Sequence, residues 1–260
     1  MTIIHGPAVY EDNMKIRRAN AAPSKRGFSL VELMISMLLL LAVFGVVLSA
    51  LMQLQRRTSA ENAKMDITQS AREFMDQAVR DLHQAGFPSP TMYSALPTPV
   101  VNNANVAAGL VSVNPNSVQF EGDVDSNGVV QSVTIQLVGS DGVTVGGACP
   151  CTLRRGRVNK ILGSPFQQPA GAQNVPTYYS ELANVATPNV FAAYDQYGYA
   201  VPLPIDLNTA PVVTASPASP VTIKSIKTLQ MMVNVQSPHP DLQNKVAPII
   251  SMSSQAGIYN

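Results

Sequence analysis

The chain has 260 residues, of which 46% are hydrophobic and only 13% are charged, and its formal net charge is +1. This length suits one domain of ordinary size with appendages. A charge so close to zero gives no sign of bulk nucleic-acid affinity, and we expect no nucleic-acid partner.

Residues 1–27 form a short basic segment of unusual design. They hold five basic and two acidic residues, a net charge of +3, which leaves −2 for the rest. An ordinary secretory signal carries its small-residue cleavage site after the apolar region. Here the small residue Gly27 stands between the basic pair Lys25-Arg26 and the apolar stretch, and no Ala-x-Ala site follows Met52. Cleavage at Gly27 would therefore leave the apolar segment at the mature N-terminus.

Residues 33–52 form an apolar run, LMISMLLLLAVFGVVLSALM, without a charge. Twenty helical residues extend about 30 Å, the thickness of the hydrocarbon core of a bilayer. The run has no polar stripe at the helical period, so it predicts a membrane span, with burial in a helix bundle as the alternative. The basic flank predicts a cytoplasmic leader and an outward-facing remainder.

The sequence KRGFSLVELMISMLLLL resembles the type IV prepilin cleavage and methylation motif. The resemblance implies that prepilin peptidase cuts after Gly27 and that Phe28 becomes the N-methylated first residue. It also implies that Glu32 pairs with the N-terminal amine of a neighbouring subunit. Glu32 is the only charge between Arg26 and Arg56, and a carboxylate in an apolar run is costly without a partner. The alternative is a side chain that reaches the headgroups at the bilayer edge.

The helix is predicted to continue beyond the membrane, over 28–86, with an anchor half over about 28–55 and an amphipathic half over about 56–86. No Pro or Gly interrupts residues 60–85, and Gly86 followed by Pro88 is a stop signal. Apolar residues recur at spacings of three and four, which makes one apolar face that can pack under a sheet: Ile67, Ala71, Phe74, Ala78, Leu82 and Ala85, widened by Met75 and Val79.

Residues 87–260 are predicted to form a β-rich head. The alternation of Val133, Ile135 and Leu137 with polar residues indicates a half-buried strand, and Asn127-Gly128 favours a hairpin between 117–124 and 129–138. Further strands are expected over 151–155, 190–194 and 223–235. The proline-rich segments 88–108, 163–188 and 201–220 are expected to be loops.

Spaced fragments of the head, among them the turn at Phe120-Glu121, Thr152-Leu153-Arg154-Arg155 and the stretch from Val190, resemble PilW-type minor pilins. They are also similar to the J-type minor pseudopilins of type II secretion. The resemblance implies an α+β fold, with a long N-terminal helix packed on an antiparallel sheet. It implies other major and minor pilins, prepilin peptidase, the inner-membrane assembly platform and membrane lipid as partners, and no cofactor.

Two short motifs in the head allow more than one interpretation. Asp123, Asp125 and Asn127 match the start of a calcium loop, but position twelve of the loop is Thr134 rather than Glu. The same residue types are also favoured in a plain hairpin turn. Cys149 and Cys151 are the only cysteines. They could form a local disulfide outside the cytoplasm or remain free thiols.

Four basic residues lie within seven positions, which suggests either an anion or DNA contact or, more simply, a solvated hairpin or a contact with acidic neighbours in the filament: Arg154, Arg155, Arg157 and Lys160. No motif for catalysis appears; His83 suits a helix end, and His239 stands between two prolines.

The leading hypothesis is thus a minor pilin that helps to initiate or cap a type IV pilus. The alternatives are a type II secretion pseudopilin and a single-pass binding protein that does not polymerise. An enzyme anchored by one helix is the least favoured of the hypotheses.

Overall fold

The computed structural model describes residues 27–92, 104–160, 176–213, 220–238, 240 and 245–259. The chain divides into two compact units, and the division falls inside a helix, between Gln53 and Leu54. We describe each unit by itself. Residues 1–26 of the basic leader and His239 lie outside the described residues.

The helix α1 runs from Leu30 to His83 over 54 residues, which confirms the predicted long N-terminal helix. All of its side chains in the first unit are exposed. The helix ends where the sequence changes to Gly86, whose φ of 86° is the left-handed conformation that glycine adopts most readily. The Gly86 N–H donates to the Glu121 carbonyl at 2.9 Å, which ties the helix exit to the sheet.

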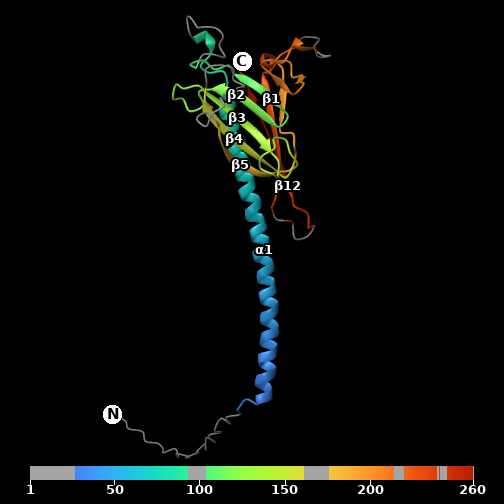
Figure 1. Ribbon diagram of the computed structural model, residues 1–260. Helices are drawn as coiled ribbons and strands as arrows, with labels where there is room; N and C mark the ends of the chain where they lie inside the picture. The colour runs from blue at the N-terminus through green and yellow to red at the C-terminus, as the bar shows by residue number, and fades with distance from the viewer. Residues whose placement is uncertain are drawn as a thin grey trace, which may run out of the picture. The chain divides into compact units, whose positions relative to one another are not determined.

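The second unit contains a ten-stranded antiparallel sheet in the order β7-β6-β11-β5-β4-β3-β2-β1-β8, with β12 on the remaining edge of β11. Figure 1 shows β2, β3, β4 and β5 side by side, with the teal part of α1 passing behind them. The strands are β1 (Leu110–Asn114), β2 (Ser117–Gly122), β3 (Gln131–Val138), β4 (Cys151–Asn159), β5 (Thr177–Val185), β6 (Phe191–Tyr194), β7 (Ala200–Val201), β8 (Ile205–Asp206), β11 (Thr228–Gln236) and β12 (Ile249–Gly257). A separate pair joins β9 (Val212–Val213) to β10 (Pro220–Val221).

The predicted hairpin is confirmed, since β2 pairs antiparallel with β3 from Ser117↔Gln136 to Gly122↔Gln131. Strands also occur where 151–155 and 190–194 were expected, but β4 extends further, to Asn159. The expected strand over 223–235 begins instead with a short 3-10 helix, Ile223–Ser225, before β11.

The expectation of a loop over 163–188 is wrong for residues 177–185, which form β5. Prolines before this segment dominated the pattern, but Leu182 and Val185 are buried against neighbouring strands. The expected loop over 201–220 contains β8, β9 and β10, each of two residues. Residues 93–103, 163–175 and 214–219 of the expected loops lie outside the described residues.

The core lies between the sheet and the second half of α1. Of the predicted apolar face, Ala71, Phe74, Met75, Ala78 and Leu82 are buried, each at 4% exposure or less. They pack with Phe120, Ile135 and Leu153 of the central strands in one cluster. At Gly122 a Cβ atom would collide with the Gln84 carbonyl, so the absence of a side chain lets β2 approach the helix end.

Candidate functional site

The cleavage motif lies directly before the helix. Gly27, Phe28 and Ser29 are exposed and non-helical, and α1 begins at Leu30. No described atom lies within 4 Å of the position that a Cβ atom on Gly27 would occupy, and Phe28 is 77% exposed. None of the described residues therefore covers the Gly27–Phe28 peptide bond.

Glu32 lies in the first turn of α1, where a carboxylate interacts favourably with the helix dipole. Its side chain is exposed, and its carbonyl accepts a hydrogen bond from the Ser36 hydroxyl at 2.7 Å. No residue in the described part of the chain forms an ion pair with Glu32. None of the described residues therefore occupies its carboxylate.

The first half of α1 is long and apolar enough to cross a membrane, by length and composition. Large apolar side chains such as Leu38, Leu40 and Val46 are about two-thirds exposed or more, at 69%, 65% and 71%. Exposure of this kind over a whole helix circumference is unfavourable in water, so this segment needs lipid or the apolar helices of other chains.

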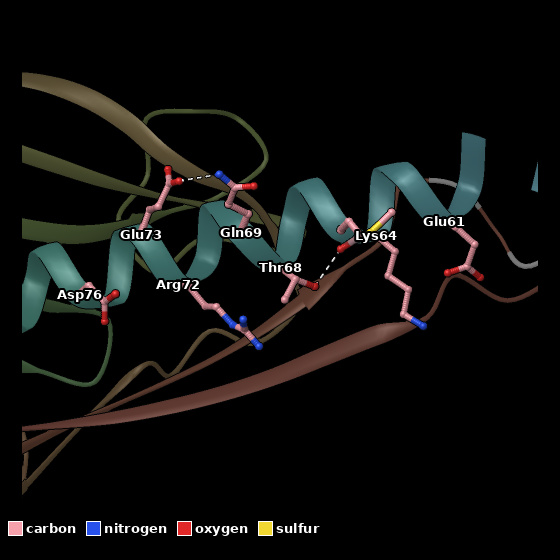
Figure 2. A pocket seen from close by; sticks show the side chains of 8 residues that line it. Glu61, Lys64, Thr68, Gln69, Arg72, Glu73 and Asp76 are labelled. Atoms are coloured by element: carbon pink, nitrogen blue, oxygen red, sulfur yellow. Dashed lines mark hydrogen bonds between the residues drawn. The ribbon is translucent and has the colours of Figure 1, made fainter. Parts of the chain in front are cut away.

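The outward side of the second half of α1 is hollowed and polar, and Figure 2 shows it from close by. Lys64 and Arg72 extend to one side of the helix, and on another side the Gln69 amide donates to the Glu73 carboxylate at 2.8 Å. Charges of both signs line the hollow: Glu61, Lys64, Arg72, Glu73 and Asp76. Such a mixed face is a solvated or partner-facing surface rather than a site for one ion.

Asp81 does not belong to the apolar face that the helix periodicity predicted. It is buried, with 2% of its side chain exposed, and it accepts from the Arg155 Nε at 2.5 Å and from the Gln77 amide at 2.7 Å. Burial raises the pKa of the Asp81 carboxyl, and the attraction of Arg155 opposes that rise only in part. The pair joins α1 to β4.

Lys160 follows β4 and is also buried. Its ammonium lies 2.7 Å from the Glu121 carboxylate, both side chains are 1% exposed, and it donates to the Val106 carbonyl at 2.7 Å. Glu121 also accepts from the Ala108 backbone N–H at 2.8 Å. The pair holds residues 106–108 against the sheet.

These two pairs correct the expectation of a solvated basic hairpin. Of the four clustered cations, Arg155 and Lys160 neutralise buried carboxylates of this same chain, and Arg157 lies 3.4 Å from Asp125 at the surface. The sequence carries only a weak signal for these pairs, since Asp81 stands beside Leu82 and Glu121 beside Phe120. Periodicity alone does not show which cation meets which acid.

In the turn that resembles a calcium loop, the Asp123 carboxylate forms hydrogen bonds with the backbone of the turn itself. The Asp123 carboxylate accepts from the backbone N–H groups of Asn127 at 3.0 Å and Gly128 at 2.9 Å. Asp125 instead accepts from the Gln131 amide at 2.9 Å. Among the described residues, no cluster of three or more His, Cys, Asp or Glu side chains could hold a metal ion.

The structure bonds Cys149 to Cys151, with Cα atoms 4.3 Å apart, in the segment that leads into β4. The ring spans a single intervening residue, so its cross-link constrains a turn rather than the fold.

A family model described as "Prokaryotic N-terminal methylation motif" matches residues 23–52. This range contains Gly27, Phe28, Glu32 and the whole apolar run over 33–52. No curated protein and no solved structure matches the chain significantly.

The long N-terminal helix with its large antiparallel sheet is a type IV pilin-like α+β architecture. Together with the methylation motif, it supports a structural subunit of the type IV pilin or pseudopilin class, anchored in a membrane, cut by prepilin peptidase and assembled with other pilins.

Proposed function

We propose that this chain is a minor pilin of the PilW type, which helps to initiate or cap the assembly of a type IV pilus. One observation carries the proposal: the first half of α1, which begins three residues after Gly27, has every side chain exposed. A helix of this kind is stable only in lipid or among other apolar helices. A filament subunit occupies these two environments in turn.

The proposed topology follows from charge. The basic leader stays in the cytoplasm, the apolar half of α1 spans the inner membrane, and the head faces the periplasm. Prepilin peptidase cuts after Gly27, and Phe28 is then N-methylated. The assembly platform moves the mature chain into a pilus, where the apolar halves of neighbouring subunits replace the lipid.

Glu32 is proposed to pair with the N-terminal amine of a neighbouring subunit. The carboxylate is exposed in the first turn of α1 and has no ion-pair partner among the described residues. In a filament core its burial without a cation would be costly, so a subunit that brings an amine within reach is favoured.

The size of the head supports a minor rather than a bulk subunit. After cleavage 233 of the 260 residues remain, and a ten-stranded sheet is a large head for a subunit that repeats along a filament. The fragments that resemble PilW-type proteins favour the same assignment.

N-terminal analysis of the chain from its native membrane tests the proposal. A methylated Phe28 is the expected result, and Gly27→Leu should leave the leader attached because the peptidase needs a small residue there. An intact Met1, or a cut near residue 55, would overturn the proposal and favour a membrane-anchored binding protein that does not polymerise.

The second candidate is a minor pseudopilin of a type II secretion system, which the J-type resemblance of the same head fragments favours. Both candidates predict the same processing. Deletion of the gene separates them: loss of surface pili with normal protein secretion indicates a pilin, and loss of secretion with normal pili indicates a pseudopilin.

A further inference from the structure

The strand β12 forms one edge of the described sheet, and none of the described strands lies on its outer side. It pairs with β11 in an unbroken register of nine residues, from Gln236↔Ile249 to Thr228↔Gly257. Within the described ranges, no other strand pairs with β12. The unpaired side is therefore a row of backbone donors and acceptors nine residues long.

The hydrogen bonds around the hairpin show which groups point outward. Ser237 N–H donates to the Pro248 carbonyl at 2.9 Å, so every second residue from 248 bonds β11. Met232 N–H donates to the Val190 carbonyl at 2.8 Å, on the opposite side of β11, which agrees with this alternation. The backbone groups of Ile249, Ser251, Ser253 and Gln255 consequently point away from β11, and no described residue bonds them.

Sheet edges in natural proteins are usually blunted, and the other edges of this head are. The terminal strands β7 and β8 have two residues each. The open part of β5 carries the charge of Glu181 and pairs with β4 through an irregular register. The sequence of β12, IISMSSQAG, has no charge and no proline. Among the described strands of the head, β12 is the one long edge strand that lacks a feature that would hinder pairing with another strand.

The core is also incomplete beside this edge. Val233 and Val235 of β11 are fully buried at 0% exposure, whereas their β12 partners Met252 and Ile250 are only partly buried. Ile249, on the solvent face, is 58% exposed. A further strand beside β12 would cover the core-facing side chains as it satisfies the backbone groups.

We infer that β12 is a docking edge for an extended, uncharged strand of a different subunit in the same filament, an inference that rests on the proposed function. Backbone pairing gives such an interaction its affinity, and alternate apolar side chains over Met252 and Ile250 give it specificity. An uncharged occupant is favoured because β12 offers no charge to pair.

A second copy of this chain fits the edge poorly. Antiparallel pairing of two β12 strands requires a two-fold axis perpendicular to the sheet. Because the stripe from Ala71 to Leu82 lies against the sheet, that axis would make residues 54–83 of the two copies run in opposite directions. In the proposed function both copies are anchored in the same membrane by the residues before Leu54, which favours the same direction for the two. Parallel pairing would put the core-facing side chains of the two copies on opposite faces.

The test uses the full chain in sheared filaments, with a photo-crosslinking residue in place of Gln255. The expected adduct joins this chain to a different filament subunit. It should fall at least about tenfold with Ser253→Pro, which removes an outward N–H and puts a ring on the edge, and persist in Ser253→Ala. Protease resistance and leader removal are expected to be equal in the two variants.

An adduct with a second copy, no adduct, or an adduct that survives Ser253→Pro would overturn the inference. Should Ser253→Pro fail to fold, hydrogen exchange of the wild-type chain decides. The Ser251, Ser253 and Gln255 amides should exchange more slowly in filaments than in detergent, and equal rates would overturn the inference. Absence of the wild-type chain from filaments would overturn the proposed function as well.

Discussion

The Asp81 Oδ2 atom lies 2.5 Å from the Arg155 Nε atom, and this contact joins the helix to the sheet across 74 positions of sequence. The two partners are not equally buried, because 2% of the Asp81 side chain is exposed and 14% of the Arg155 side chain. The carboxylate is thus the more dependent of the two on its partner.

Arg155→Met is expected to lower the free energy of unfolding by about 3 kcal/mol at neutral pH, because it leaves a buried carboxylate without its cation. Asp81→Asn combined with Arg155→Met should recover most of this loss, since no buried charge then remains. Urea denaturation of the three proteins measures both effects. A double variant no more stable than Arg155→Met would contradict the explanation.

The same pair predicts a pH dependence. The unfolded carboxyl of Asp81 titrates near 3.8, and burial raises its folded pKa, so the folded state binds more protons between the two values. The stability that Asp81 contributes is therefore present below 3.8 and is lost as the pH rises through the folded pKa. Relative to Asp81→Asn, the wild type should become less stable as the pH rises from about 4. Denaturation curves over this range test the sign, and a difference that grows in favour of the wild type would contradict it.

Lys160→Met is expected to destabilise the head by about 3 kcal/mol, because the Glu121 carboxylate, 1% exposed, would lose its cation. Arg157→Met is the matched control. Its ion pair is longer, at 3.4 Å, and its side chain is 48% exposed, so its loss should cost less than about 1 kcal/mol. Chemical denaturation compares the two. Equal effects would mean that burial does not determine the strength of these pairs.

Asp123→Ala should destabilise the hairpin by about 1–2 kcal/mol, since the backbone N–H groups of Asn127 and Gly128 lose their acceptor. Calcium is expected to leave the melting temperature of the wild type unchanged, because Asp123 already serves the turn. A calcium-dependent rise in Tm that Asp123→Ala abolishes would show that the loop binds the ion after all.

Glu32→Ala is expected to leave leader removal possible and to reduce incorporation into filaments by about tenfold, because a neighbouring amine loses its counter-charge. Glu61→Ala, which removes an exposed acid further along the same helix, should assemble normally. The ratio of mature chain in sheared filaments to chain in the membrane is the measurement. Equal ratios for the two variants would argue against a pairing role for Glu32.

Local patterns in the sequence were sufficient for the features whose causes are local. The order of basic pair, Gly27 and apolar run predicted the methylation motif, which the family match at residues 23–52 supports. The spacing of apolar residues predicted α1 and its buried stripe, and Asn127-Gly128 predicted the β2–β3 hairpin. Each depends on residues a few positions apart, which interact in the same way in most folds.

Contacts between distant parts of the chain decided the rest. Strand β5 pairs with β4, although the prolines before it suggested a loop. Strand β12 forms because nine of its residues pair with β11. Asp81 is buried only because Arg155 meets it from β4, and Lys160 only because Glu121 lies opposite. The burial of a charge depends on a partner far along the chain, so the tertiary structure alone determined these pairs and the edge that β12 leaves open.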